Sequence, residues 1–99
     1  MFIKKKIKIK NPQGLHARPA SVFVKIANKF EADVTVKRGS ESVNGKSIMG
    51  LLMLAASQGA SIDVEVSGAD AHEAMRELEA FLLSDAEDDA QSSKDKDKA

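Results

Sequence analysis

The sequence contains no cysteine, which excludes a disulfide framework, thiolate chemistry and a cysteine-rich zinc site. This absence suits the reducing cytoplasm, where we expect the protein to be located. No apolar stretch is long enough to span a bilayer, and residues 1–10 lack the continuous apolar run of a signal peptide, so we expect no membrane insertion. The 15 basic and 15 acidic side chains cancel, so net charge gives no argument for nucleic acid as a partner.

Motifs that bind nucleotides or metals are also missing. The sequence has neither a GxGxxG pattern nor a P-loop. Its two histidines, His16 and His72, lie far apart along the chain, and no spacing assembles further ligands beside either of them. We therefore expect no metal site and no cofactor. We interpret His72 as a surface residue in the first turn of a helix.

The pattern of apolar residues predicts the secondary structure of a single domain with one modest core. Alternation of apolar and polar residues predicts strands over residues 3–10, 32–37 and 62–67, with a short strand at 42–43. Steps of three and four predict helices over residues 17–29 and 71–84. A short helix should follow Ser47, its predicted N-cap, and stop near Gly59, while Asp70 should cap the last helix. The buried stripe of the short helix should comprise Ile48, Leu51, Leu52 and Ala55.

The element order is strand, helix, strand, strand, helix, strand, helix. Strands with one apolar and one polar face require a sheet that is covered on one side only, which favours antiparallel pairing. We therefore predict an α+β fold, an open-faced β-sandwich with a four-stranded antiparallel sheet and three helices on one face. Periodicity does not determine the strand order. The large apolar residues stop before Asp85, so we predict a domain at 1–84 and a disordered charged tail at 85–99.

A row of lysines marks one face of the first predicted strand. This row could be a stripe that binds nucleic acid, or a solvated sheet face whose charges discourage edge pairing. We favour the second interpretation, because no aromatic side chain is interleaved with the lysines as a platform for single strands requires. The apolar face carries Ile3, Ile7 and Ile9, and the basic face carries Lys4, Lys6, Lys8 and Lys10.

Residues 11–20 concentrate unusual chemistry where a strand should lead into a helix. Gly14 permits a turn, and Pro19 suits the first helical turn, where its missing N–H costs nothing. His16 is a nucleophile near neutral pH, and Arg18 is a fixed cation that pairs with phosphate oxygens. A helix start with free amides attracts anions. These residues favour phosphate chemistry on His16, although a loop imidazole that merely caps the helix is an alternative.

Two motifs carry a close family resemblance. Gly14-Leu15-His16-Ala17-Arg18-Pro19-Ala20 resembles the active-site signature of HPr, the histidine phosphocarrier family of the bacterial phosphoenolpyruvate-dependent sugar phosphotransferase system. A second motif resembles that family's regulatory serine segment, and the similarity runs over residues 2–83. The family fold, four antiparallel strands beneath three helices, agrees with the pattern. The second motif is Asn44-Gly45-Lys46-Ser47-Ile48-Met49-Gly50.

The resemblance implies specific roles. His16 would accept phosphate at its Nδ1 from phosphorylated enzyme I and pass it to an enzyme IIA domain, with Arg18 holding the phosphoryl group. The chain would then be a phosphoryl carrier and not a stand-alone enzyme. Ser47 would be the site of HPr kinase/phosphorylase where the host has that enzyme, although a plain N-cap is the alternative reading.

Partner docking needs an apolar patch near His16. Methionine suits adaptable contacts with several partners, although filling the core is an equally open role for each one. We expect this patch to be ringed by Arg18 and Lys46, shared by donor and acceptor, and carried by a monomer. Its expected members are Leu15, Ala17, Lys46, Ile48, Met49 and Met53.

Three other functions stay open. The run over residues 47–54 resembles at least as closely a nitrogen-related regulatory branch of the family, whose acceptor controls other proteins and transports nothing. A binding co-regulator, like the catabolite-repression paralogue that replaces the active histidine, is disfavoured by His16. A small α+β ligand-binding or hydrolase domain is disfavoured by the lack of further catalytic groups.

Overall fold

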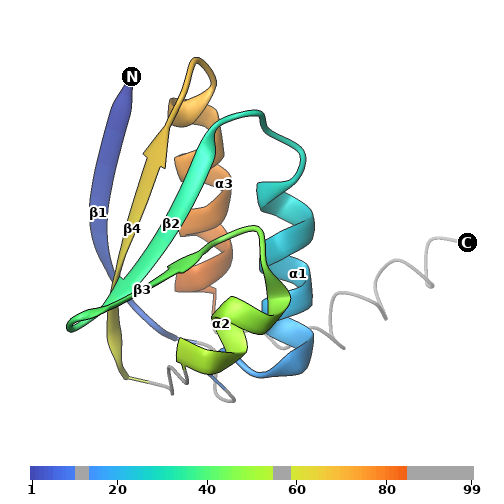
Figure 1. Cartoon of the computed structure of the whole chain (residues 1–99), viewed down its shortest axis with the longest axis vertical. Coiled ribbons are helices and arrows are strands. Elements are labelled where there is room, and N and C mark those ends of the chain that lie inside the picture. The colour runs from blue at the N-terminus through green and yellow to red at the C-terminus, as the bar shows by residue number, and fades with distance from the viewer. Residues whose placement is uncertain (11–13, 55–58, 85–99) are drawn as a thin grey trace, which may run out of the picture.

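The computed structural model describes residues 1–10, 14–54 and 59–84. Within these residues, a four-stranded sheet forms one layer and three helices form the other (Figure 1). The described residues thus confirm the predicted α+β open-faced sandwich. The predicted tail at 85–99 lies outside them. The elements are β1 (Phe2–Lys8), α1 (Ala17–Ala27), β2 (Asp33–Arg38), β3 (Glu41–Asn44), α2 (Ile48–Leu54), β4 (Ser61–Ser67) and α3 (Ala71–Leu83).

The sheet has the order β1-β4-β2-β3, which sequence periodicity had left open. All pairs of neighbouring strands are antiparallel, and the register places Ile3 and Val34 on either side of Val66. Because side chains alternate between the two faces of a strand, this register gathers the apolar residues on the face beneath the helices. Ile7, Val36 and Val64 are buried on that face.

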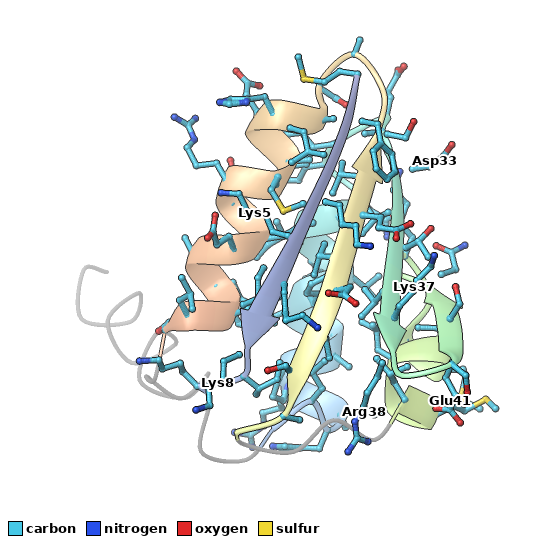
Figure 2. All side chains as sticks on the ribbon, turned by 90° about the vertical axis from the view of Figure 1, so that its left-hand side faces the viewer. Lys5, Lys8, Asp33, Lys37, Arg38 and Glu41 are labelled. Carbon is cyan, nitrogen blue, oxygen red and sulfur yellow. The ribbon has the colours of Figure 1, made fainter. Side chains whose placement is uncertain are left out.

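The outer face of the sheet carries charges of both signs (Figure 2). Lys6 Nζ lies 3.5 Å from a carboxylate oxygen of Asp63, and Lys37 Nζ lies 3.1 Å from one of Glu65. This cross-strand pairing supports the interpretation of a solvated face. Such exposed pairs stabilise the fold by less than about 1 kcal/mol each.

Helix α1 begins at Ala17 as predicted but ends at Ala27, two residues before the predicted end. The amides of Lys29 and Phe30 donate to the carbonyls three residues earlier, at 3.1 and 3.2 Å. These tighter bonds close the last turn and stop the α-helical ladder.

Helix α2 buries a different set of residues from the predicted stripe. Leu51 and Leu54 are buried and Leu52 is half-buried, but Ile48 is 41% exposed. Ile48 therefore does not belong to the buried stripe, and its exposure agrees instead with its predicted place in the docking patch. Ala55 lies outside the described residues, whereas Gly59 adopts the predicted left-handed conformation with φ +90°.

Asp70 precedes α3, and its carbonyl accepts the Ala74 N–H at 3.0 Å. Its carboxylate makes no capping bond and accepts the backbone N–H groups of Glu31 and Ala32 instead, both at 2.9 Å. Asp70 is thus the N-cap residue as predicted, but its side chain does not cap the helix. The pairing of β2 with β4 brings the loops before β2 and after β4 together, which places these two amides within reach.

Among the described residues, no helix combines the length and the apolar character that a membrane crossing requires.

Candidate functional site

His16 is the N-cap residue of α1. Its backbone is extended, with φ −99° and ψ −162°, and its carbonyl accepts the Ala20 N–H at 2.8 Å. The preceding turn needs the positive φ of Gly14, +72°, which glycine adopts without a steric cost. The imidazole is half-buried and makes no capping hydrogen bond. The alternative in which His16 merely caps the helix is therefore wrong in this structure.

The first turn of α1 suits a negatively charged group. Ala17 and Arg18 are exposed, and the turn contains no acidic side chain that would repel an anion. The first amides of a helix lack partners within the helix, and the helix dipole adds a partial positive charge there. Pro19 is buried and contributes no N–H. His16 and Arg18 therefore stand together at a helix start whose chemistry suits an anion.

Ser47 caps α2 as predicted. Its Oγ accepts the Gly50 N–H at 3.0 Å, and its carbonyl accepts the Leu51 N–H at 3.1 Å. At the other end of α2, the Arg38 guanidinium donates to the Leu54 carbonyl at 3.1 Å. Arg38 thus binds the C-terminal end of α2, a contact that no pattern in the sequence indicates. A basic side chain commonly bonds the last carbonyls of a helix, but only the fold brings the end of β2 to this one.

The outer side of α2 exposes large apolar side chains. Met49 is 68% exposed and Met53 is 73% exposed, so a core-filling role is wrong for both. Together with Ile48 they form an apolar surface that we call the α2 patch. Figure 1 shows α2 at the same end of the molecule as the beginning of α1. The fold thus places α2 at the end of the molecule that carries the His16 helix start, while Met53 lines a hollow with residues 41–43 of β3.

Two predicted members of the docking patch lie elsewhere. Leu15 is only 4% exposed and belongs to the core, where Ala20 is also buried. Apolar residues before an N-cap and in the following helical turn commonly pack together, which explains why Leu15 points inward. Lys46 extends to the far end of α1, where its ammonium donates to the Phe30 carbonyl at 2.8 Å. Neither residue can line a patch beside His16 in this arrangement.

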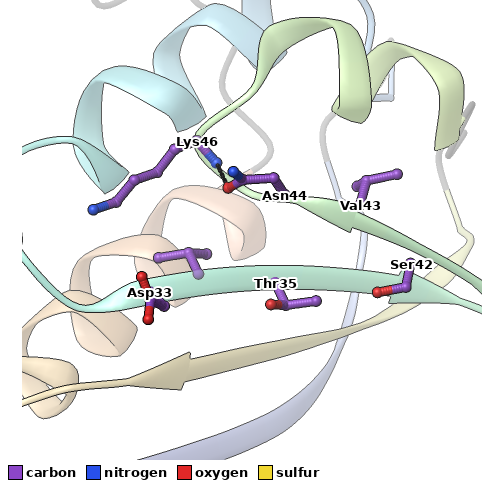
Figure 3. Close-up of a pocket in the computed structure, with 7 residues that line it drawn as sticks. Asp33, Thr35, Ser42, Val43, Asn44 and Lys46 are labelled. Carbon is purple, nitrogen blue, oxygen red and sulfur yellow. Dashed lines mark hydrogen bonds between the residues drawn. The ribbon is translucent and has the colours of Figure 1, made fainter.

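An open groove occurs where β3 diverges from β2, away from His16. Figure 3 shows Asp33 and Thr35 on one wall and Asn44 on the other, where the Asn44 Oδ1 accepts the Lys46 backbone N–H at 2.8 Å. The walls hold no nucleophile with an adjacent base. Across the described ranges, no group of three or more histidine, aspartate or glutamate side chains is placed to hold a metal ion. The groove therefore adds no chemistry to the site.

Known proteins resemble this chain in sequence over most of its length. The family model PTS-HPr, described as "PTS HPr component phosphorylation site", matches residues 3–84. The phosphocarrier protein HPr of Neisseria meningitidis is 50% identical over 77 residues, which cover 78% of this chain and 86% of that protein. The HPr-like protein Crh of Bacillus subtilis is 40% identical over 81 residues, which cover 82% of this chain and 95% of Crh.

Solved structures show the same fold. The crystal structure of HPr from Bacillus anthracis has a TM-score of 0.80 and 39% identity, covering 83% of this chain and 98% of that one. A crystal structure of Crh from Bacillus subtilis, described as a dimer with a swapping domain, has a TM-score of 0.67 and 40% identity over 81% of this chain and 92% of that one. The sequence match and the shared fold together show that this chain belongs to the HPr family of phosphocarrier proteins of the phosphotransferase system.

Proposed function

We propose that this protein is a histidine phosphocarrier, in which His16 accepts a phosphoryl group from phosphorylated enzyme I and donates it to enzyme IIA domains. One observation carries the proposal: the His16 imidazole stands at the start of α1 without a capping bond, beside the exposed first turn that contains Arg18. A side chain used for capping would have to break that bond before it could act as a nucleophile.

The transfer makes one bond and breaks one at each step. The phosphoryl group leaves enzyme I and bonds to Nδ1 of His16, and that N–P bond then breaks when the acceptor takes the group. The phosphoryl oxygens bring negative charge to the helix start, where the first-turn amides and the Arg18 guanidinium stabilise them. The chain ends each cycle unchanged, as a carrier does.

The partners dock on the α2 patch together with Ala17 and Arg18. Donor and acceptor must approach the same imidazole in turn, so one surface has to accommodate two different proteins. Methionine side chains are flexible and polarizable, and the exposed Met49 and Met53 can adapt to both.

Ser47 is the proposed site of regulation by HPr kinase/phosphorylase. A phosphoserine carries about 1.5 to 2 negative charges at neutral pH and would stand at the N-terminus of α2, where the helix dipole favours it. The fold should therefore persist after modification. The new charge lies directly before Ile48 and Met49, so it should repel an acidic partner from the α2 patch.

The test is phosphorylation with phosphoenolpyruvate and enzyme I. We expect one acid-labile, base-stable phosphate on the natural chain, none on His16→Ala, and a full label on His72→Ala, the matched control on the surface of α3. A label that persists on His16→Ala would exclude His16 from the reaction.

Two other functions are distinguished by the same reagents. A co-regulator that binds partners without carrying phosphate is disfavoured by the presence of His16, and absence of label on the natural chain would support it. Efficient transfer to a nitrogen-type regulatory IIA domain, with none to sugar-specific IIA domains, would instead assign the chain to a regulatory phosphorelay.

A further inference from the structure

Strand β1 leaves one side of its backbone unpaired. Within the described residues it forms an edge of the sheet, with β4 on its only paired side. The Ile9 amide donates to the Ala60 carbonyl at 2.8 Å, and the Met1 carbonyl accepts the Gly68 N–H at 2.8 Å. The backbone N–H and C=O groups of the odd-numbered residues of β1 are therefore directed toward β4. Along a strand of an antiparallel pair, the backbone groups of alternate residues point in opposite directions, so those of the even-numbered residues point away from β4. The N–H and C=O groups of Lys4, Lys6 and Lys8 are therefore directed toward the open edge.

A groove runs between this edge and α3. Its cavity of about 240 Å³ has an apolar floor of Ile3 and Met75, and Met75 is buried. Lys5 crosses between β1 and α3, where its ammonium lies 2.8 Å from a Glu79 carboxylate oxygen (Figure 2). The groove is thus an apolar slot with a polar rim beside an open strand. The residues that line it are Ile3, Lys5, His72, Met75, Arg76 and Glu79.

Part of the positive charge at this edge has no acidic partner among the described residues, although Lys5 and Lys6 pair with Glu79 and Asp63. Lys4, Lys8 and Arg76 are exposed, and none of them forms an ion pair with another residue in the described ranges. By contrast, the outer sheet face next to this edge holds the carboxylates of Asp63 and Glu65. A polyphosphate lying across that face would meet these carboxylates as well as lysines, whereas acidic side chains at the edge would lie beside the exposed Lys4 and Lys8.

We propose that the β1 edge and its groove bind an extended acidic peptide of a partner protein as a further strand of the sheet. The peptide backbone would pair with the outward N–H and C=O groups of Lys4, Lys6 and Lys8. Alternate residues of a strand point to opposite faces, so acidic side chains would lie beside those lysines and apolar ones would enter the groove over Ile3 and Met75. The ligand class is an extended segment in which acidic and β-branched residues alternate.

This surface is separate from the phosphocarrier site. Strand β1 and strand β3, against which α2 packs, are the opposite edges of the sheet. A bound peptide would therefore leave the α2 patch accessible. The protein could engage a regulatory partner and a phosphotransfer partner at the same time.

The test uses the full chain, labelled with ¹⁵N, and the acetylated and amidated peptide Asp-Val-Asp-Val-Asp-Val-Asp. We expect saturable binding with shifts and slowed hydrogen exchange at the amides of Lys4, Lys6 and Lys8. A peptide that is N-methylated at every residue keeps its side chains but lacks the N–H groups for pairing, and a peptide with lysine in place of aspartate reverses the charge; both should fail to bind. The double variant Lys4→Glu/Lys8→Glu should bind roughly tenfold more weakly, whereas Lys25→Glu on α1 should bind normally.

Several results would overturn the proposal. Equal binding of the N-methylated or lysine peptide would exclude strand addition at a basic edge, and shifts confined to Met49 and Met53 would place the peptide on the α2 patch. If the peptide binds only after removal of residues 85–99, the natural occupant of the edge would be the chain's own acidic C-terminal segment. If, without peptide, the protection of the β1 amides from hydrogen exchange increases with protein concentration, the edge would instead bind a second copy of the chain. None of these results depends on whether His16 carries phosphate.

Discussion

Gly45 lies between β3 and α2, and its backbone approaches a buried side chain very closely. A Cβ atom added at Gly45 would lie 2.4 Å from Cγ1 of Val34 and 3.1 Å from the Val34 carbonyl oxygen. Favourable carbon contacts lie near 3.5 to 4.0 Å, so the methyl group of alanine would overlap Val34 by about 1 Å. Val34 cannot yield easily, because it is buried and its carbonyl accepts the Gly45 N–H at 2.7 Å.

We predict that Gly45→Ala destabilises the fold by about 2 to 3 kcal/mol, toward the upper end of the usual cost of overpacking. For a domain of this size, that change lowers the melting temperature by about 10 to 20 °C. Thermal unfolding followed by circular dichroism measures it. Gly39→Ala is the comparison, since open space surrounds Gly39 and only its positive φ of +61° opposes a side chain. It should cost about 1 kcal/mol.

A double-mutant cycle tests the cause. Val34→Ala removes the methyl group that the new Cβ would meet. In that background the destabilisation by Gly45→Ala should therefore be smaller by at least about 1 kcal/mol. A melting temperature of Gly45→Ala within about 2 °C of the natural chain would refute the argument. So would equal costs of the substitution in both backgrounds, because the overlap would then not be with Val34.

Three further predictions follow from the described contacts. Asp70→Ala should lower the free energy of unfolding by about 2 kcal/mol in urea titrations, because the buried Ala32 amide loses a charged acceptor; Asp70→Asn, which keeps one acceptor oxygen, should cost roughly half as much. Ser47→Ala should cost about 1 kcal/mol and speed hydrogen exchange of the Gly50 amide, whereas Ser47→Thr should preserve both values. Met53→Glu should change stability by less than about 0.5 kcal/mol but slow phosphoryl transfer from enzyme I at low enzyme concentration, and an unchanged transfer rate would exclude Met53 from docking.

Much of the secondary structure was predictable because it depends on near neighbours in the sequence. The alternation over β4 and the helical spacing over α3 each produce one apolar face, whatever the rest of the chain does. The start of α1 at Ala17 and the cap at Ser47 likewise depend on residues within one helical turn. The ends of the elements were less predictable, as the early end of α1 shows.

The candidate site was predictable only in part. The position of His16 beside Arg18 follows from adjacency in the sequence, and the exposure of Met49 and Met53 agrees with their place off the apolar stripe. Leu15 was assigned to the docking patch because it adjoins His16, but neighbouring residues at a helix start can point in opposite directions. The core contains Leu15 because burial of an apolar side chain there is more favourable than its exposure.

The sequence alone determined the fold class, the helix start that carries His16 and the cap that Ser47 forms, because the spacing of apolar residues and the hydrogen bonds of helix caps each involve only a few neighbouring residues. The tertiary structure decided the strand order, the inward position of Leu15 and the extension of Lys46 to Phe30. These depend on which distant segments pack together, and that choice follows from burying the whole core at once. Among the residues that the structure describes, the same choice leaves the backbone of β1 open beside α3, a feature that no local pattern indicates.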